Sequence, residues 1–467
     1  MKNNMFLKIM MGTLTGTAMI SSCNEKLNSK KVKGPNILFI FTDQQTINDM
    51  GAYGNPYVRT PNMDNLARFG VRFTQSYCTS PVSAPSRSSF MTGHMPHETK
   101  VIYNDNCMQG SFLTMGELFQ KAGYKTYYAG KWHLPEEYPA AKDRDSIPGF
   151  QLLKFKNKER ISGYGKDSDP IVTSAVEDFF HKKPEQPFLL CVSLLNPHDI
   201  CGVPYNIHNL DTVVNPDCLP ALPANHPYDP DEPEFIKECR NRTHYGQEVS
   251  STHNFSSKDW RQYLYHYYRY TEKVDAEIGR IIEALEYAGL EENTLIIFTS
   301  DHGDGASSHH WAVKLSFYEE PVKVPFIVTW FGKTPAGRVD STHLISGLDV
   351  LPTMLGYAGL EIPTNIEGRN VKQIIDNPLA SWRSYLVSEL APDPDKKDFI
   401  GRMIRTERFK YNIYSWGKHN EQFFDLKKDP GEMHNLANDS CMKNFIEQHR
   451  IILKQWSDST SDYFKTK

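Results

Sequence analysis

Long apolar runs bounded by polar residues most constrain how this chain can fold. Five such runs each predict a strand, at residues 36–42, 124–129, 187–195, 294–300 and 324–330. The first run is almost continuous, which is typical of a strand buried on both faces of a parallel sheet. Amphipathic helices are predicted at 111–123 and 257–289, between strands. Strands alternating with helices predict an α/β fold with a mostly parallel central sheet flanked by helices.

The pattern changes near residue 375. Residues 403–406 are a short mixed run and 409–413 alternate apolar with polar residues, as a half-buried strand does. A helix is expected over 440–456. We therefore predict a large catalytic domain over 35–374 and a smaller C-terminal subdomain with an antiparallel sheet over 375–467.

The first 22 residues have the pattern of a bacterial export signal, with two lysines, an apolar stretch and small residues at its end. Ile20-Ser21-Ser22-Cys23 resembles a lipobox, which predicts lipidation of Cys23 and a polar tether over 23–34. Simple cleavage next to an incidental cysteine is the alternative. We expect an exported lipoprotein at the periplasmic face or the cell surface, held at the membrane through its lipid anchor.

Charge and cysteine usage exclude some classes of function. The formal net charge of −4 argues against nucleic acid as a partner, because nucleic-acid binders usually carry a basic excess. The cysteines show no zinc-ligand spacing. Export permits disulfides, for which Cys201, Cys218 and Cys239 are the nearest candidates, whereas buried free thiols are an equally good reading.

Polar residues with metal-binding or acid–base chemistry follow four of the predicted strands. They are Asp43, Gln44, Lys131, His133, His198, Asp301 and His302. One aspartate after a strand is more often a cap or turn residue. Their joint appearance at the carboxyl ends of strands, where open α/β sheets bind ligands, predicts a shared site.

The segment that begins Ser83-Ala84-Pro85-Ser86-Arg87 is predicted to be a loop that enters a helix. Pro85 suits the first helical position and Gly93 the exit. The amino end of a helix attracts anions, so an anion on Ser83 would have Arg87 as its counter-ion. Capping of the helix by Ser83 is the structural alternative.

The run from Ser83 to Arg87, with the ending Met91-Thr92-Gly93, resembles the signature of the type I sulfatases. The resemblance extends to Gly130-Lys131-Trp132-His133, to residues 347–353 and to 424–430. It covers most of the chain after the tether and implies the alkaline-phosphatase-like fold. It also implies that Ser83 is oxidised to formylglycine by a serine-type sulfatase-maturing enzyme.

By the same resemblance, one divalent cation is held under the sulfate group. The implied ligands are Asp43, Gln44, Asp301 and His302, with the modified Ser83 completing the set. Oxygen donors favour Ca²⁺. Gln44 and His302 stand where many members have Asp and Asn, so Mn²⁺ and Mg²⁺ remain open.

The resemblance also implies roles in hydrolysis of a sulfate ester. One hydroxyl of the formylglycine hydrate would attack sulfur, and Arg87, Lys131 and Lys314 would offset charge on the sulfate oxygens. His133 would be the base that triggers elimination and His198 the acid that protonates the leaving alcohol. His309 is a candidate for substrate binding, with a structural histidine as an equal alternative.

The expected substrates are sulfated saccharides derived from glycosaminoglycans or mucins. Sugar recognition is expected in residues 199–255, whose composition predicts an irregular loop, and in the C-terminal subdomain. Arg240, Arg242 and His244 are the candidates for meeting a second anionic group, and a purely structural covering loop is the alternative. Two rival functions remain. One is a phosphomonoester or phosphonate hydrolase of the same superfamily, and the other an inactive glycan-binding lipoprotein.

Overall fold

The computed structural model describes residues 34–464, apart from 107, 110–111, 135–145, 156–162, 209–214 and 243–246. The predicted export segment, Cys23 and His244 lie outside the described residues. Within the described part of the chain, no helix combines the length and apolar character that crossing a bilayer requires.

The main sheet, as far as the chain is described, has nine strands in the order β10-β2-β9-β8-β1-β7-β4-β6-β5. Its strands are β1 (Asn36–Asp43), β2 (Val71–Phe73), β4 (Lys125–Gly130), β5 (Ser146–Ile147), β6 (Phe150–Leu152), β7 (Phe188–Pro197), β8 (Thr294–Ser300), β9 (Phe326–Thr329) and β10 (Arg338–Asp340). The central neighbours β8, β1, β7, β4 and β6 are parallel, whereas β9 is antiparallel to both β8 and β2. The mostly parallel sheet is therefore confirmed.

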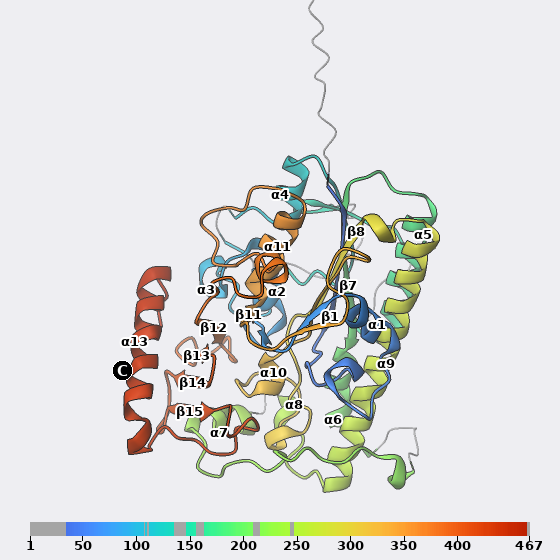
Figure 1. Cartoon of the computed structure of the whole chain (residues 1–467). Helices are drawn as coiled ribbons and strands as arrows, with labels where there is room; N and C mark the ends of the chain where they lie inside the picture. Colours follow the sequence, from blue (N-terminus) through green and yellow to red (C-terminus); the bar gives the residue numbers. More distant parts are fainter. Residues whose placement is uncertain are drawn as a thin grey trace, which may run out of the picture. The chain divides into compact units, whose positions relative to one another are not determined.

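Helices cover both faces of this sheet (Figure 1). One layer contains α2 (Ser83–Thr92), α4 (Met115–Lys121), α11 (Val350–Tyr357) and α12 (Lys372–Asp376), and the other contains α1 (Pro61–Phe69), α5 (Gly165–His181) and α9 (Ser257–Tyr287). Short helices elsewhere are α3 (Pro96–Thr99), α6 (Val203–Asn206), α7 (Glu234–Asn241), α8 (Gln247–Ser250) and α10 (Glu319–Val322). Single turns of 3-10 helix occupy 51–53, 198–202, 216–218, 291–293, 308–310, 347–349 and 440–442.

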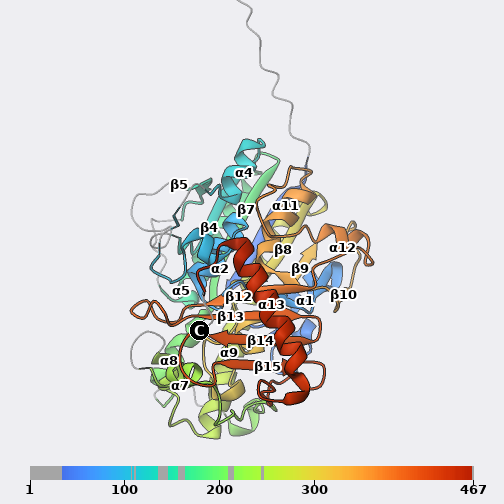
Figure 2. The ribbon, with the colours of Figure 1, turned by 90° about the vertical axis from the view of Figure 1, so that its left-hand side faces the viewer.

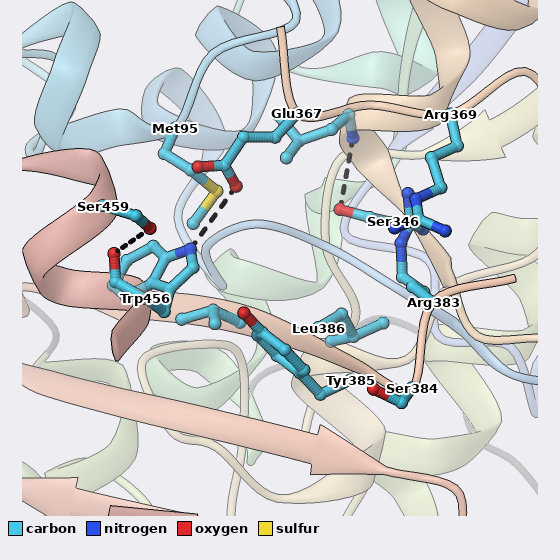
Figure 3. Close-up of a pocket in the computed structure, with 12 residues that line it drawn as sticks. Met95, Ser346, Glu367, Arg369, Arg383, Ser384, Tyr385, Leu386, Trp456 and Ser459 are labelled. Carbon is cyan, nitrogen blue, oxygen red and sulfur yellow. Dashed lines mark hydrogen bonds between the residues drawn. The ribbon is translucent and has the colours of Figure 1, made fainter. Parts of the chain in front are cut away.

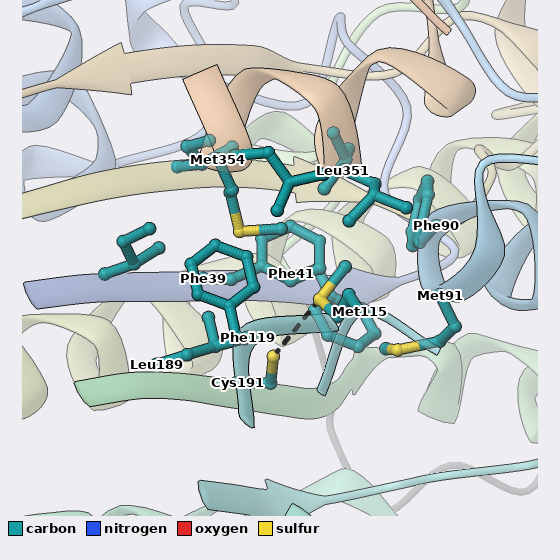
Figure 4. Packing of buried hydrophobic residues seen from close by; sticks show 14 of the residues in the cluster. Phe39, Phe41, Phe90, Met91, Met115, Phe119, Leu189, Cys191, Leu351 and Met354 are labelled. Carbon is teal, nitrogen blue, oxygen red and sulfur yellow. Dashed lines mark hydrogen bonds between the residues drawn. The ribbon is translucent and has the colours of Figure 1, made fainter. Parts of the chain in front are cut away.

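The alternation of side chains along β1 explains why its sequence is apolar without interruption. Phe39 and Phe41 enter the core beneath α2, α4 and α11, whereas Leu38 and Ile40 enter the core beneath α1, α5 and α9. Figure 4 shows the first of these cores, where the rings of Phe39 and Phe41 stack at 4.7 Å and Phe90 meets both edge-on. Burial on both faces fixes the register of the strand.

A second, antiparallel sheet forms the C-terminal part. It contains β12 (Tyr385–Leu390), β13 (Gly401–Thr406), β14 (Phe409–Tyr414) and β15 (Glu421–Asp425), in that order, and α13 (Lys443–Thr460) packs on it. Figure 2 shows α13 lying across these strands. The small antiparallel sheet is confirmed. The predicted boundary of this part at residue 375 stays a prediction. Ile374 and Ile375, just before it, pack in the core of the main sheet. A further two-stranded sheet joins β3 (Ser76–Tyr77) to β11 (Ile345–Ser346).

Three local expectations need correction. The helix expected at 111–123 is shorter, because Thr114 caps α4 by accepting from the Glu117 N–H and the helix ends at Lys121. The helix after the expected loop at 83 begins at Ser83 itself, so Pro85 lies at its third position, where an N–H still needs no intrahelical partner. Gly93 ends that helix with φ 75°, as expected. Residues 199–255 include short helices rather than forming one irregular loop.

The cysteines that the structure describes, Cys78, Cys191, Cys201, Cys218, Cys239 and Cys441, are free. The free-thiol alternative therefore holds for the three cysteines that sequence proximity had grouped. Burial raises the pKa of the Cys191 thiol well above its usual range, so this core residue is chemically inert.

His97 joins the short helix α3 to the C-terminal part. Its Nδ1 lies 2.6 Å from Glu389 Oε1 and its Nε2 lies 3.1 Å from the Thr460 carbonyl oxygen, so both ring nitrogens face acceptors. Burial opposes protonation, but Glu389 outweighs it and raises the pKa of His97 to about 9. At neutral pH this histidine is an imidazolium.

A raised pKa in the folded state predicts a pH-dependent stability. The stabilisation by His97 should be complete below pH 6.5 and should be lost as the pH rises through 9, with a total of roughly 3 kcal/mol. Urea unfolding of the wild type and of His97→Gln at pH 6, 8 and 9.5 measures this loss as a difference between the two proteins. The same pH slope in both would show that His97 is not charged in the folded state.

Candidate active site

Four parallel strands bring the predicted site residues to one edge of the main sheet. Asp43 ends β1, Lys131 follows β4, His198 follows β7 and Asp301 follows β8. Because β1, β4, β7 and β8 run in the same direction, their carboxyl ends lie together, as the sequence predicts. The amino end of α2 places Ser83 at the same edge, since Ser83 Oγ lies 3.4 Å from Asp43 Oδ1.

Ser83, Asp43, Asp301 and His302 surround one point. The ligating atoms of Asp43, Asp301 and His302 all lie within 4.8 Å of one another. His302 Nε2 is 2.9 Å from Ser83 Oγ, 3.8 Å from Asp43 Oδ1 and 3.7 Å from Asp301 Oδ1. Burial lowers the pKa of His302 to about 4, so its ring is neutral and able to ligate a cation at neutral pH. This donor set fits a divalent cation.

Arg87 holds the two carboxylates in place. Its Nε donates to Asp301 Oδ2 at 2.8 Å and one terminal nitrogen donates to Asp43 Oδ2 at 2.9 Å. The other terminal nitrogen donates to the Lys131 carbonyl oxygen and to Ser193 Oγ. The guanidinium is fully buried and occupied by these partners. Arg87 thus orients the two acids of the site.

Lys131 contacts the same acid. Its Nζ donates to Asp43 Oδ2 at 2.5 Å, and the side chain is almost fully buried. Burial would raise the pKa of Asp43, but the charges of Lys131 and Arg87 hold it well below its usual range. The preceding Gly130 has φ 98°, and a Cβ there would lie 1.8 Å from the Ser193 carbonyl oxygen, so only glycine allows this turn into the site.

The two candidate acid–base histidines lie within electrostatic range of Asp43. Burial lowers the pKa of His133 well below its usual value, reinforced by Lys131 and Arg87. Burial also lowers the pKa of His198, where Asp43 opposes it and Lys131 adds to it. Buried His133 Nδ1 has no hydrogen-bond partner among the described residues. Both rings are neutral without substrate, which suits a base directly and an acid after its pKa rises.

Gln44 lies at the site, but the contacts of its side chain are with protein groups rather than the predicted ones with a metal. Its side-chain Nε2 donates to Asp304 Oδ2 at 2.9 Å, and its Oε1 accepts from the Cys201 thiol at 3.3 Å. Its backbone N–H donates to Asp301 Oδ1, while Tyr267 donates to its carbonyl oxygen. Metal ligation by the amide stays a prediction. Sequence reasoning assigned no role to Asp304, although that residue also follows β8, and it is the partner that positions Gln44.

The other candidates divide into two groups. Lys314 belongs with the site, because its charge acts on Asp43, Lys131 and His133. His309 instead stacks on Tyr318 at 3.9 Å and forms a separate buried group with Glu320 and Glu432.

Arg240 and Arg242 are buried and ion-paired. Arg240 is bidentate to Glu232, and Arg242 pairs with Asp393 at 2.6 Å. With their charges neutralised in this way, neither guanidinium is available for a second anionic group without breaking a buried pair. His244, the third residue of that prediction, lies outside the described residues.

Strained backbone gathers next to the site. Gln44 has φ 70° and His133 has φ 56°, both in the left-handed region that non-glycine residues rarely adopt. The segment after Asp304 has further residues of this kind, including Val313 and Leu315 on either side of Lys314. Such conformations persist where surrounding structure over-determines them, which is typical of functional sites.

Comparisons with known proteins identify the family. The model of the Sulfatase family matches residues 35–360, and that of the N-sulphoglucosamine sulphohydrolase C-terminal region matches 307–458. The chain is 30% identical to a Delta 4,5-hexuronate-2-O-sulfatase of Bacteroides thetaiotaomicron over 92% of this chain and 90% of that protein. The solved structure of a 2-O GAG sulfatase superposes with a TM-score of 0.81 at 28% identity, covering 92% and 93%.

A phosphonate monoester hydrolase of Agrobacterium radiobacter shares the fold. The TM-score is 0.76 at 23% identity, over 91% of this chain and 96% of that one. At this level of identity the similarity extends to the fold alone.

Proposed function

Because the chain belongs to the sulfatase family and is a sulfuric ester hydrolase, we propose that it removes sulfate from sulfated saccharides of the glycosaminoglycan or mucin type. The reaction would use a formylglycine formed from Ser83 and one divalent cation. The observation that carries this proposal is the position of Ser83 Oγ, 2.9 Å from His302 Nε2 and 3.4 Å from Asp43 Oδ1.

The donor atoms suit one cation at this point. Asp43, Asp301 and His302 would hold it together with residue 83, and the cation would supply positive charge to the sulfate oxygens. Oxygen donors from two carboxylates favour Ca²⁺, whereas the imidazole of His302 leaves Mn²⁺ and Mg²⁺ as alternatives.

An unmodified serine is a poor nucleophile at neutral pH, and the hydrate of a formylglycine would supply a better one. Ser83 has no exposed surface in the folded chain. A serine-type maturing enzyme would therefore have to reach this residue before folding is complete. The aldehyde oxygen would occupy the position where Ser83 Oγ lies between Asp43 and His302.

The remaining residues divide the work of binding and proton transfer. Lys131 and Lys314 supply positive charge beside Asp43 for the sulfate oxygens. His133, neutral at physiological pH, can accept a proton. His198 is neutral as well, so it can act as the acid only if the negative charge of the bound ester raises its pKa.

The proposal is tested with enzyme matured in the presence of a serine-type sulfatase-maturing enzyme. Peptide mass spectrometry should show residue 83 lighter by about 2 Da, which is the loss of two hydrogens on oxidation of an alcohol to an aldehyde. A panel of defined sulfated mono- and disaccharides should then release sulfate only in proportion to the modified fraction.

Two results would contradict the proposal. Full activity with an unmodified hydroxyl at 83 would exclude the formylglycine mechanism. Turnover of phosphonate and phosphate monoesters without release of sulfate would favour the rival hydrolase, and binding of saccharides without any turnover would favour the inactive binding protein.

A further inference from the structure

A pocket with polar and apolar walls lies near the end of α2 that is opposite Ser83. It has a volume of about 340 Å³, and Met95, just beyond the C-terminal end of α2, lines it. Ten helical residues separate the two ends by roughly 15 Å, so the pocket is distinct from the metal site. Its walls come from both parts of the molecule, with Arg369 and Arg383 on one side and Tyr385 and Trp456 from the C-terminal part (Figure 3).

Asp349, whose charge acts on Arg369, is paired with the other arginine of the pocket, Arg383. Asp349 accepts from both terminal nitrogens of Arg383, from the Ser346 N–H and from the Arg369 N–H. These four bonds use the lone pairs of both carboxylate oxygens. The guanidinium of Arg369 makes no ion pair among the described residues, and the charge of Arg383, after burial, lowers the pKa of Arg369. Arg369 is therefore the arginine of this pocket whose guanidinium is not held by an ion pair among the described residues, and it lies at the end away from Glu367 (Figure 3).

The opposite end of the pocket has groups that suit sugar hydroxyls. Glu367 Oε2 accepts from Trp456 Nε1 at 3.4 Å, which leaves acceptor capacity on the carboxylate. The hydroxyls of Tyr385 and Ser384 make no hydrogen bond with any described residue. Figure 3 shows Glu367 and Trp456 together, away from the two arginines. An aromatic ring, free hydroxyls and one carboxylate are a combination that binds the face and edge of a sugar.

We propose that this pocket binds an anionic sugar residue of a glycan, with Arg369 contacting its carboxylate or sulfate group. The choice of a saccharide as ligand rests on the proposed function, whereas an anionic group is favoured because the guanidinium of Arg369 makes no ion pair among the described residues. A glycan held here would be retained near the catalytic site between turnovers. The pocket would thus act on polymeric substrates and leave small ones unaffected.

The test compares binding and catalysis in matched variants. Binding is measured as retardation in native gels that contain hyaluronan, chondroitin sulfate or neutral dextran, with Ser83→Ala in every protein so that no sulfate is removed. Arg369→Ala should weaken retardation by both anionic polymers roughly tenfold or more, because a charge-assisted contact is lost. Arg408→Ala is the control, since Arg408 is exposed and pairs with Asp425 on the same sheet. It should be retarded like its parent.

Catalysis separates a binding role from a structural one. Catalysis is measured in matured enzyme without the Ser83→Ala substitution. There, Arg369→Ala should leave kcat/KM for a small aryl sulfate unchanged and raise KM for a sulfated polymer. Tyr385→Phe is a second variant, to be used if Arg369→Ala folds poorly. It keeps the ring, loses the hydroxyl and should also weaken retardation. The negative charge of hyaluronan comes from carboxylates alone, whereas chondroitin sulfate also has sulfates. Comparing the two polymers therefore separates these two sources of negative charge.

Several results would overturn the pocket. Equal retardation of Arg369→Ala and its parent would do so, as would equal losses in Arg369→Ala and Arg408→Ala, or retardation by dextran as strong as by hyaluronan. The proposed function fails separately. If the wild type released no sulfate from saccharides but was retarded in an Arg369-dependent way, glycan binding in the pocket would be supported and the proposed function would be contradicted.

Discussion

Ser83→Ala is expected to lower sulfate release from a sulfated saccharide by a factor on the order of 10⁴ or more, the usual loss when a catalytic nucleophile is removed. The change deletes the oxygen that lies 2.9 Å from His302 Nε2 and 3.4 Å from Asp43 Oδ1. It also deletes the carbon–oxygen bond that oxidation requires. Initial rates of sulfate release, measured with both proteins expressed beside the same maturing enzyme, give the factor.

Ser88→Ala is the matched control for this experiment. Ser88 is also buried in α2, but its hydroxyl donates to the Pro85 carbonyl oxygen at 2.7 Å and lies one turn further along the helix. It should keep activity close to that of the wild type. Comparable activity of Ser83→Ala and Ser88→Ala would show that residue 83 does not take part in the chemistry.

Asp301→Ala is expected to abolish cation binding and turnover and to destabilise the fold by about 3 kcal/mol, because it leaves a buried guanidinium short of a partner. Asp301 Oδ2 accepts from Arg87 Nε at 2.8 Å, and Oδ1 accepts from the Gln44 and His302 N–H groups. Asp301→Asn keeps the volume and should fold better, but it should also lose the cation, since it lacks the charge. Metal content by mass spectrometry and urea unfolding separate the two losses.

The matched control for Asp301 is Asp340→Asn. Asp340 is also buried, but it lies on the edge strand β10 and pairs with His343. It should retain the cation and its activity. Removal of metal from the wild type with a chelator should reproduce the activity of Asp301→Asn, and re-addition of Ca²⁺, Mn²⁺ or Mg²⁺ should identify the cation. Wild-type rates after complete chelation would contradict the metal-dependent mechanism.

The length and burial of each element explain which parts of the fold could be predicted from the sequence. β1, β7 and β8 are buried on both faces, and burial of that kind leaves almost no choice of residue, so their runs are visible in the sequence. β2, β3, β10 and β11 have two or three residues each, too few for a period to appear, and they were missed. The helix α5 was missed for a different reason, since Pro170 interrupts its pattern within the first turns.

The carboxyl ends of the parallel strands explain what could be predicted of the site. The positions of Asp43, Lys131, His198 and Asp301 at one edge follow from strand direction alone, because parallel strands end together. The type of residue at each strand end, together with the run from Ser83 to Arg87, indicated the chemistry. What each side chain contacts is a different question.

The sequence by itself determined the class of sheet, the edge at which the chemistry lies and the residues at that edge, because these depend on local runs of the chain. Only the tertiary structure decided which charges are already neutralised. Arg240 is a predicted ligand-binding residue, yet it is bidentate to Glu232, whereas the guanidinium of Arg369, which the sequence does not single out, makes no ion pair among the described residues. Pairing of charges depends on distances between segments far apart in the chain, and no local pattern of residues records those distances.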